Sequence, residues 1–199
     1  MRVLALDCSS ESAAAGVYEH GLCLAEGFLD NGLTHSQTLA PLIGRVLSDA
    51  KTAPRDIGRV AVTNGPGSFT GVRVGVAAAL GFAAAYGAEY AGVSSLLAAA
   101  QSYAGCEGVI AAMQDARRGR VFAALFRAGG GTLARLTEDA NMTPAEAEAL
   151  AAGALARAAR VYSRGVYLAC LRGGATPPGV VEYIRPSQAE RRRDSKRNA

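Results

Sequence analysis

Histidine is scarce in this chain of 199 residues, and its scarcity excludes one class of site. The two histidines are His20 and His35, and the four cysteines lie far apart with no Cys-x-x-Cys pair. Transition-metal centres need several imidazole or thiolate ligands close together. The sequence therefore predicts no such centre, and we interpret the cysteines as reduced thiols in the core.

Long apolar runs and targeting signals are lacking as well. The longest apolar segment, residues 72–86, is interrupted by Arg73 and is shorter than the ~20 residues that cross a bilayer. Residues 1–7 read as a strand with no basic leader. Because half of the residues are apolar and only 19% are charged, disorder is excluded. We expect a folded, cytoplasmic protein that does not enter a membrane.

Signatures of covalent catalysis and of phosphate binding are also missing. Serines are abundant, but there is no G-x-S-x-G sequence, and no Ser–His–Asp arrangement can be assigned. The segment Asp7-Cys-Ser-Ser-Glu11, which follows the first predicted strand, has none of the glycines of a phosphate loop. Asp7 could organise a metal-bound water, or it could cap the adjacent turn. The chain is predicted to be non-catalytic and to hold no metal of its own.

The net charge of +4 comes entirely from the C-terminal end. Residues 185–199 contain six basic and two acidic residues, which leaves fifteen of each sign in residues 1–184. A basic tail can attract nucleic acid, and it can equally serve as a solubilising end. The residues that would contact nucleic acid are Arg191, Arg192, Arg193, Lys196 and Arg197.

The order of the predicted elements indicates an α/β fold with an internal repeat. Residues 1–104 form the first predicted lobe, 105–184 a reduced second lobe, and 185–199 the basic tail. In the first lobe we expect strands at 3–6, 12–18 and 22–29, a helix at 34–51 that begins at Thr34, a strand at 59–63 and a helix at 71–87. In the second lobe we expect strands at 109–115, 121–127 and 132–136, a helix at 144–160 that begins with Thr143, Pro144 and Glu146, and a helical stretch to Leu171.

The helix predicted at 71–87 carries small residues every four positions. They are Gly71, Gly75, Ala79, Ala83 and Gly87. Two glycines inside a helix cost about 1 kcal/mol each relative to alanine, so close packing should offset that cost. Because the helix is apolar on nearly all sides, both faces need cover. One face can pack on its own sheet, and the other needs either a second chain or the helix at 34–51.

A glycine-rich segment joins the strand at 59–63 to this helix. Its spacing is neither that of a P-loop nor G-x-G-x-x-G, so it is either a tight bend or an anion cradle at a helix start. The segment comprises Asn64, Gly65, Pro66, Gly67, Ser68, Phe69, Thr70, Gly71 and Arg73.

The same segment resembles the signature of the TsaB (YeaZ) family. Residues 2–11, 33–37 and 182–190 resemble three further family segments, whereas the match between 127 and 182 is thin. The resemblance implies two ribonuclease-H-like lobes of the actin, Hsp70 and sugar-kinase superfamily, with the second lobe reduced. It also implies the dimerisation subunit of the bacterial machinery that places threonylcarbamoyl on adenosine in ANN-decoding tRNAs.

The resemblance further implies partners and a contact surface. The expected partners are the paralogous transferase TsaD, the ATPase TsaE and, through the complex, tRNA; ATP and metal are expected on those partner subunits. TsaD would be bound and activated through the first two helices, and in isolation the same helices could pair in a homodimer. The implied contact residues are Leu39, Leu42, Ile43, Val46, Val72, Gly75, Val76, Ala79, Leu80 and Ala83.

Two other functions stay open as alternatives. An independent ATPase or sugar-type kinase would use Asp7 and Asp115 in a cleft between the lobes, and ATP turnover by the isolated chain would reveal it. A peptidase is the third possibility, although no nucleophile–base pair or metal motif supports it.

Overall fold

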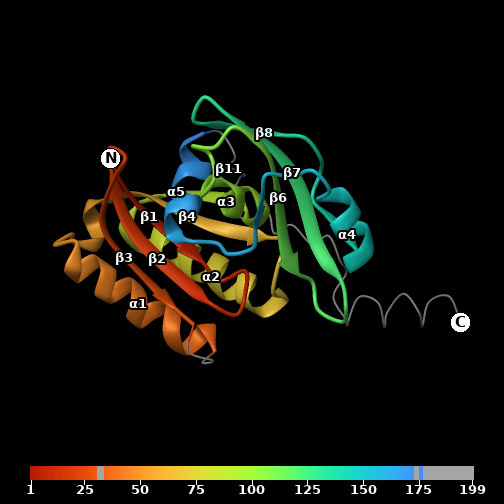
Figure 1. The fold of residues 1–199 in the computed structure, drawn as a ribbon. Helices are drawn as coiled ribbons and strands as arrows, with labels where there is room; N and C mark the ends of the chain where they lie inside the picture. Colours follow the sequence, from red (N-terminus) through yellow and green to blue (C-terminus); the bar gives the residue numbers. More distant parts are fainter. Residues whose placement is uncertain (31–33, 173–174, 177–199) are drawn as a thin grey trace, which may run out of the picture.

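Two mixed β-sheets and five α-helices make up the computed structural model, which describes residues 1–30, 34–172 and 175–176 (Figure 1). The first sheet has the order β11-β5-β4-β1-β2-β3. Its central strand β1 is antiparallel to β2 and parallel to β4, with Leu4 opposite both Val17 and Val60. The strands are β1 (Arg2–Asp7), β2 (Ala13–Glu19), β3 (Leu22–Leu29), β4 (Ile57–Gly65), β5 (Glu89–Ser94) and β11 (Ala175–Thr176).

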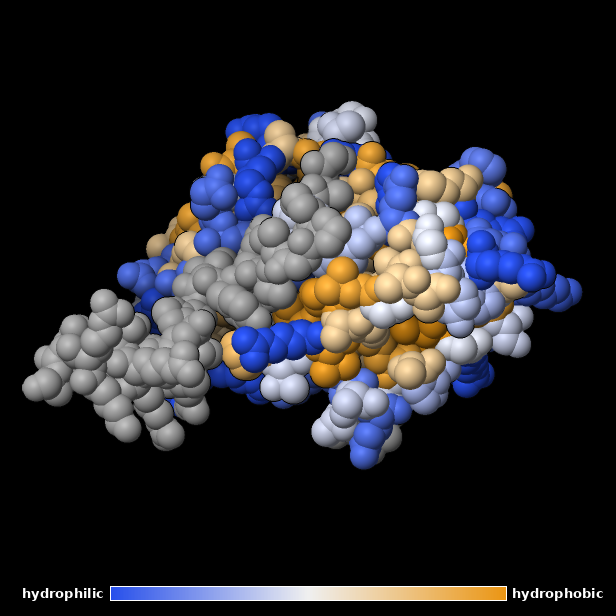
Figure 2. Space-filling view, turned by 180° about the vertical axis from the view of Figure 1, so that it is seen from behind, coloured by the Kyte–Doolittle hydropathy of each residue, from blue (hydrophilic) through white to orange (hydrophobic). Residues whose placement is uncertain are grey.

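Two helices cover the outer face of the first sheet. Helix α1 (His35–Asp49) begins after Thr34, and α2 (Phe69–Tyr86) begins after Ser68, whose hydroxyl caps it. Leu4 and Leu6 of β1 pack against the buried sides of both helices, because alternate strand residues point to the same face. A 3₁₀ turn, η1 (Pro54–Asp56), leads into β4. Seen from behind, hydrophobic residues gather in the middle of the molecule (Figure 2).

The second sheet repeats the first on a smaller scale. Its order is β10-β6-β7-β8, with β9 also paired to β7, and β6 is antiparallel to β7 and parallel to β10. Helix α4 (Pro144–Leu150) packs against β7. The strands are β6 (Gly108–Asp115), β7 (Val121–Gly129), β8 (Thr132–Arg135), β9 (Ala140–Met142) and β10 (Ala156–Ala158).

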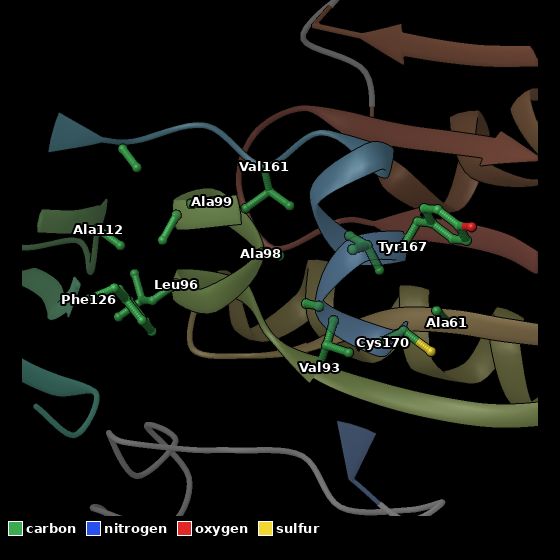
Figure 3. Close-up of a cluster of buried hydrophobic side chains, with 14 of the residues drawn as sticks. Ala61, Val93, Leu96, Ala98, Ala99, Ala112, Phe126, Val161, Tyr167 and Cys170 are labelled. Atoms are coloured by element: carbon green, nitrogen blue, oxygen red, sulfur yellow. The ribbon is translucent and has the colours of Figure 1, made fainter. Parts of the chain in front are cut away.

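Helices α3 (Ser95–Gln101) and α5 (Ser163–Leu171) fill the space between the two sheets and pack on each other. The close-up in Figure 3 places Leu96 of α3 beside Phe126 of the second sheet. On the other side of this core, Tyr167 and Cys170 of α5 lie over the first sheet. The helix that ends the second half of the chain therefore completes the core of the first half.

The predicted fold class is confirmed. Both halves begin with antiparallel strands followed by a helix, a strand and a helix: three strands precede α1 in the first half, and four, including the short β9, precede α4 in the second. The helix predicted at 144–160 is wrong: α4 ends at Leu150, and residues 156–158 pair with β6 as β10. Gly153 adopts the left-handed conformation (φ 79°), which stops the alanine-rich helix. Strand β5 and helix α3 were not predicted, because a short run of small residues carries little periodicity.

Candidate functional site

The glycine-rich segment forms the junction between β4 and α2. The backbone N–H of Ser68 donates to the carbonyl oxygen of Ser9 at 2.7 Å, and the Ser68 hydroxyl accepts from the N–H of Gly71 at 3.2 Å. A Cβ on Gly67 would overlap the backbone of Ser9, and a Cβ on Gly71 would overlap the carbonyl oxygen of Cys8. These glycines therefore let the start of α2 press against the loop that follows β1.

This packing bears on the choice between a bend and an anion cradle. The N–H groups of Ser68, Gly71 and Val72 all donate to groups of the chain itself. An anion at a helix start needs such N–H groups for itself. The Ser68 and Gly71 N–H groups are thus not available to an anion, which favours the tight bend.

Most of the implied contact residues lie in the chain's own core. On α1 and α2, seven of the ten are buried against the first sheet, and they cannot reach a partner directly. Gly75 shows why: a Cβ there would lie 3.3 Å from Cγ2 of Val62 in β4. The first three residues of the small-residue stripe, Gly71, Gly75 and Ala79, thus serve close packing on the sheet, and the seven buried residues are core positions of this chain. The buried residues are Leu39, Leu42, Val46, Val72, Gly75, Val76 and Ala79.

The side of α2 that faces away from the sheet is apolar, and small apolar residues of α1 lie exposed among polar ones such as Gln37 and Arg45. The remaining three of the ten implied contact residues, Ile43, Leu80 and Ala83, are half-buried on this side. We call the surface the docking face, and it comprises Ala40, Ile43 and Gly44 of α1 with Ala77, Leu80, Gly81 and Ala84 of α2. A Cβ on Gly44 or Gly81 would meet no atom within 4 Å, so the surface is open at both positions.

One charged residue borders the docking face on α2. Arg73 is exposed, and its guanidinium lies 3.8 Å from the centre of the Phe69 ring, which is 38% exposed. Within the described residues, α2 is the one helix long and apolar enough to cross a membrane. Its inner side packs on the sheet, so it is a core helix with one side uncovered.

The carboxyl end of β1 carries a buried acid. Oδ1 of Asp7 accepts from the N–H of Ser9 at 3.0 Å and from the hydroxyl of Thr63 at 2.6 Å. Burial raises the pKa of Asp7, and those hydrogen bonds only partly oppose the rise. Asp7 therefore does cap the turn that follows β1.

The second candidate acid of the ATPase alternative points elsewhere. Asp115 is exposed, and it accepts from the N–H of Arg117 at 2.8 Å. The residue of β6 that faces the first lobe is Gln114, which is 6% exposed and whose Nε2 lies 3.5 Å from the Ser9 hydroxyl. Strand alternation would have found Gln114, because Ile110, Ala112 and Gln114 share one face. In the part of the chain that the structure describes, no three His, Cys, Asp or Glu residues are grouped for a metal ion.

The predicted nucleic-acid contacts of the tail, Arg191, Arg192, Arg193, Lys196 and Arg197, lie outside the described residues. They remain a sequence prediction.

Comparison with known proteins supplies the family. Residues 32–172 match the family model described as TsaD, tRNA N6-adenosine threonylcarbamoyltransferase. The Bacillus subtilis tRNA threonylcarbamoyladenosine biosynthesis protein TsaB is 32% identical over 146 residues, which are 73% of this chain and 64% of that protein. The Escherichia coli protein of the same name is 35% identical over 130 residues, 64% of this chain and 55% of the relative. This chain thus spans less than two thirds of these relatives' lengths.

Solved structures agree with the fold. The structure titled YeaZ from Pseudomonas aeruginosa aligns with a TM-score of 0.76 at 22% identity, over 93% of this chain and 99% of that one. Another, titled as similar to peptidase YEAZ from the same organism, has a TM-score of 0.79 at 23% identity and covers 92% of this chain and 99% of that one. From the matched model, the named relatives and the shared fold, we conclude that the chain belongs to the TsaB (YeaZ) family.

Proposed function

We propose that this chain is a non-catalytic subunit in the biosynthesis of threonylcarbamoyladenosine on ANN-decoding tRNAs, and that it binds and activates a TsaD-type transferase. The observation that carries the proposal is the docking face, an apolar helix surface that extends over α1 and α2. Contiguous exposed apolar surface of this kind marks a protein–protein contact. The pathway comes from the relatives, which are named as tRNA threonylcarbamoyladenosine biosynthesis proteins.

The open glycines suit helix-to-helix contact. Small residues on an outer surface allow a partner helix to approach within about 8–10 Å, axis to axis. Gly44 and Gly81 supply such positions on the two neighbouring helices. A second copy of the chain could use the same surface when the transferase is absent. The activating step is then differential binding: contacts that favour the competent state of the transferase raise its population, and this chain performs no chemistry.

The remaining parts of the proposal concern the other components. ATP and metal belong to the TsaD and TsaE subunits, tRNA reaches this chain through the complex, and the complex works in the cytoplasm. The basic residues of the tail that we propose to guide tRNA are Arg191, Arg192, Arg193, Lys196 and Arg197. Neutralising them should weaken tRNA binding by the complex and flatten its salt dependence.

The docking face is tested by adding bulk where the chain itself has room. Gly81→Leu and Gly44→Leu should weaken co-purification with TsaD by roughly tenfold or more, since each side chain would hold the partner helix away. Gly105→Leu is the matched control, because a Cβ at Gly105 also meets no atom within 4 Å and the residue lies after α3. Unchanged binding by both folded docking-face variants would remove this surface from the interface.

The pathway itself is tested in cells. Depletion of this protein should lower threonylcarbamoyladenosine in digested tRNA, measured by mass spectrometry, and the intact gene should restore it. Unchanged modification after verified depletion would contradict the proposal. ATP turnover by the isolated chain, lost in Asp7→Ala, would instead favour the kinase or ATPase alternative.

A further inference from the structure

The loop that follows β1 presents two consecutive carbonyl groups to the starts of the two docking-face helices. The carbonyl oxygen of Ser9 accepts from the N–H of Ser68, the cap residue of α2, at 2.7 Å. The next carbonyl oxygen, that of Ser10, is bonded at 2.8 Å to Nε2 of His35, the first residue of α1. Because a carbonyl oxygen only accepts, Nε2 of His35 is the donor. One short loop thus holds the starts of both helices.

The imidazole ring of His35 also lies against α2. A Cβ on Gly71, in the first turn of α2, would lie only 2.7 Å from Cδ2 and 3.0 Å from Nε2 of the ring. The glycine therefore leaves the room that the half-buried ring occupies. A single side chain of α1 thus contacts both the loop after β1 and the beginning of α2.

Two features leave the first turn of α1 weakly anchored from within the helix. The side chain of Thr34 makes no capping hydrogen bond, and no acidic residue lies in the first turn to complement the helix dipole. Pro41 has no N–H for the carbonyl group of Gln37, so the hydrogen-bond ladder is interrupted early in the helix. The contacts of His35 with the loop and with α2 therefore weigh heavily in where this turn lies.

We propose that His35 is a positioning residue of the docking face. Its hydrogen bond to Ser10 and its contact with Gly71 fix the first turn of α1 relative to α2, so the surface is formed before a partner binds. A surface already in its bound arrangement binds more tightly, because no binding free energy is used to order it. Where only a fraction of the molecules has that arrangement, the apparent affinity falls by that fraction. This inference rests on the proposed docking to a TsaD-type transferase.

The test measures the affinity of the whole chain for TsaD at 25 °C by isothermal titration calorimetry, with circular dichroism to show that each variant is folded. His35→Ala should weaken binding about three- to tenfold, because the hydrogen bond and the ring contact are lost. His35→Gln keeps an amide donor for the Ser10 carbonyl and should recover most of that loss. Thr34→Ala is the matched control at the same helix start and should bind like wild type, since Thr34 makes no capping hydrogen bond.

A second comparison separates positioning from a general loss of stability. Tyr167→Phe removes a hydrogen bond to Gly21 on the opposite side of the first sheet, so it should lower stability and leave the affinity for TsaD unchanged. In hydrogen exchange of the free chain, the amides of residues 36–40 should exchange faster in His35→Ala than in Tyr167→Phe. A residue that only stabilised the fold would not produce this difference.

The outcomes also separate this inference from the proposed function. If folded His35→Ala binds TsaD as tightly as wild type while Gly81→Leu binds more weakly, the positioning role is overturned and the docking face stands. An equal loss of affinity in Tyr167→Phe overturns the positioning role as well, and so does a His35→Gln variant that binds no better than His35→Ala. If neither His35→Ala nor Gly81→Leu changes the affinity, the docking face is not the contact surface and both proposals fail.

Discussion

The ring of Tyr167 in α5 stacks on the ring of Tyr18 in β2, with centroids 4.6 Å apart and planes 10° from parallel. Hydrogen bonds extend this contact on both sides. The Tyr167 hydroxyl accepts from the N–H of Gly21 at 2.8 Å, and the Tyr18 hydroxyl lies 2.8 Å from both Ser163 Oγ and Glu26 Oε2. One aromatic pair thus fastens the last described helix to the first sheet.

We expect Tyr167→Ala to lower the free energy of unfolding by about 3–5 kcal/mol, because it removes a buried ring from between two layers. Tyr167→Phe keeps the stack and loses the bond to Gly21, so it should cost only about 1 kcal/mol. Urea unfolding followed by circular dichroism measures both. If the two variants lose equal stability, the ring stack is not what holds α5.

Substitution of two glycines of α2 should change the stability of the chain in opposite directions. Gly75→Leu forces a side chain toward Val62 and Cys8, whose nearest atoms lie 3.3 and 3.5 Å from the added Cβ, and should destabilise the chain by about 1–3 kcal/mol. Gly81→Ala adds a methyl group in open space and should stabilise it by about 0.5–1 kcal/mol. Midpoints of urea unfolding give both values, and a stabilised Gly75→Leu would contradict the packing described here.

Gly165 marks the closest approach of the two central helices. A Cβ there would overlap the carbonyl oxygen and the backbone of Ala98 in α3. Gly165→Ala should therefore lower the Tm by several degrees, through a loss of about 1–3 kcal/mol. Gly105→Ala is the matched control and should change the Tm little. Differential scanning calorimetry distinguishes them, and equal Tm values would mean that α3 and α5 can separate at little cost.

The stability that the first turn of α4 contributes should fall as the pH is lowered. Hydrogen bonds from the N–H and hydroxyl of Thr143 lower the pKa of Glu146, and the Thr143 hydroxyl in turn accepts from the N–H of Glu146. A lowered pKa in the folded state gives stability that is present at neutral pH and is lost as the pH falls through that pKa. Glu146→Gln should thus have a lower free energy of unfolding than wild type at neutral pH, and the two values should become equal in acid.

Thr143→Ala removes the cap itself. It should cost about 1 kcal/mol at neutral pH, because the first turn of α4 loses a partner for its N–H groups. Urea unfolding at several pH values measures both α4 variants. If the difference in free energy of unfolding between Glu146→Gln and wild type grows in acid, the lowered pKa of Glu146 is contradicted.

Local signals in the sequence suffice for the elements that carry clear boundaries. Thr34 precedes α1 as predicted, although its side chain makes no capping hydrogen bond, and Thr143 and Glu146 form the predicted capping box at α4. Helix α2 begins two residues before the predicted Gly71, because the Ser68 hydroxyl caps it. These are short-range patterns, because a cap depends on residues within one helical turn. The repeat of strands followed by a helix, and hence the fold class, follows from them.

The parts of the fold and of the site that the sequence does not predict depend on contacts between residues far apart in the chain. Alanine-rich residues 151–158 favour a helix locally, yet residues 156–158 pair with β6 because that register completes the second sheet. Seven implied contact residues share an apolar character with the docking face, and only the position of the sheet separates the two sets. Asp7 and Asp115 each end a hydrophobic strand, so the sequence makes them look equivalent. In the structure, the residue of β6 that points into the core is Gln114, and Asp115 is exposed.

The position of α5 also bears on how the chain folds as it is made. The first sheet has its last parallel strand once Ser94 is synthesised, but the helix that covers its inner face begins about 70 residues later, at Ser163. At roughly 5–20 residues per second, the ribosome needs about 4–14 s to supply it. During that interval the part of the sheet face that α5 covers lies bare in the nascent chain, and a chaperone or the ribosome surface would have to shield it from aggregation.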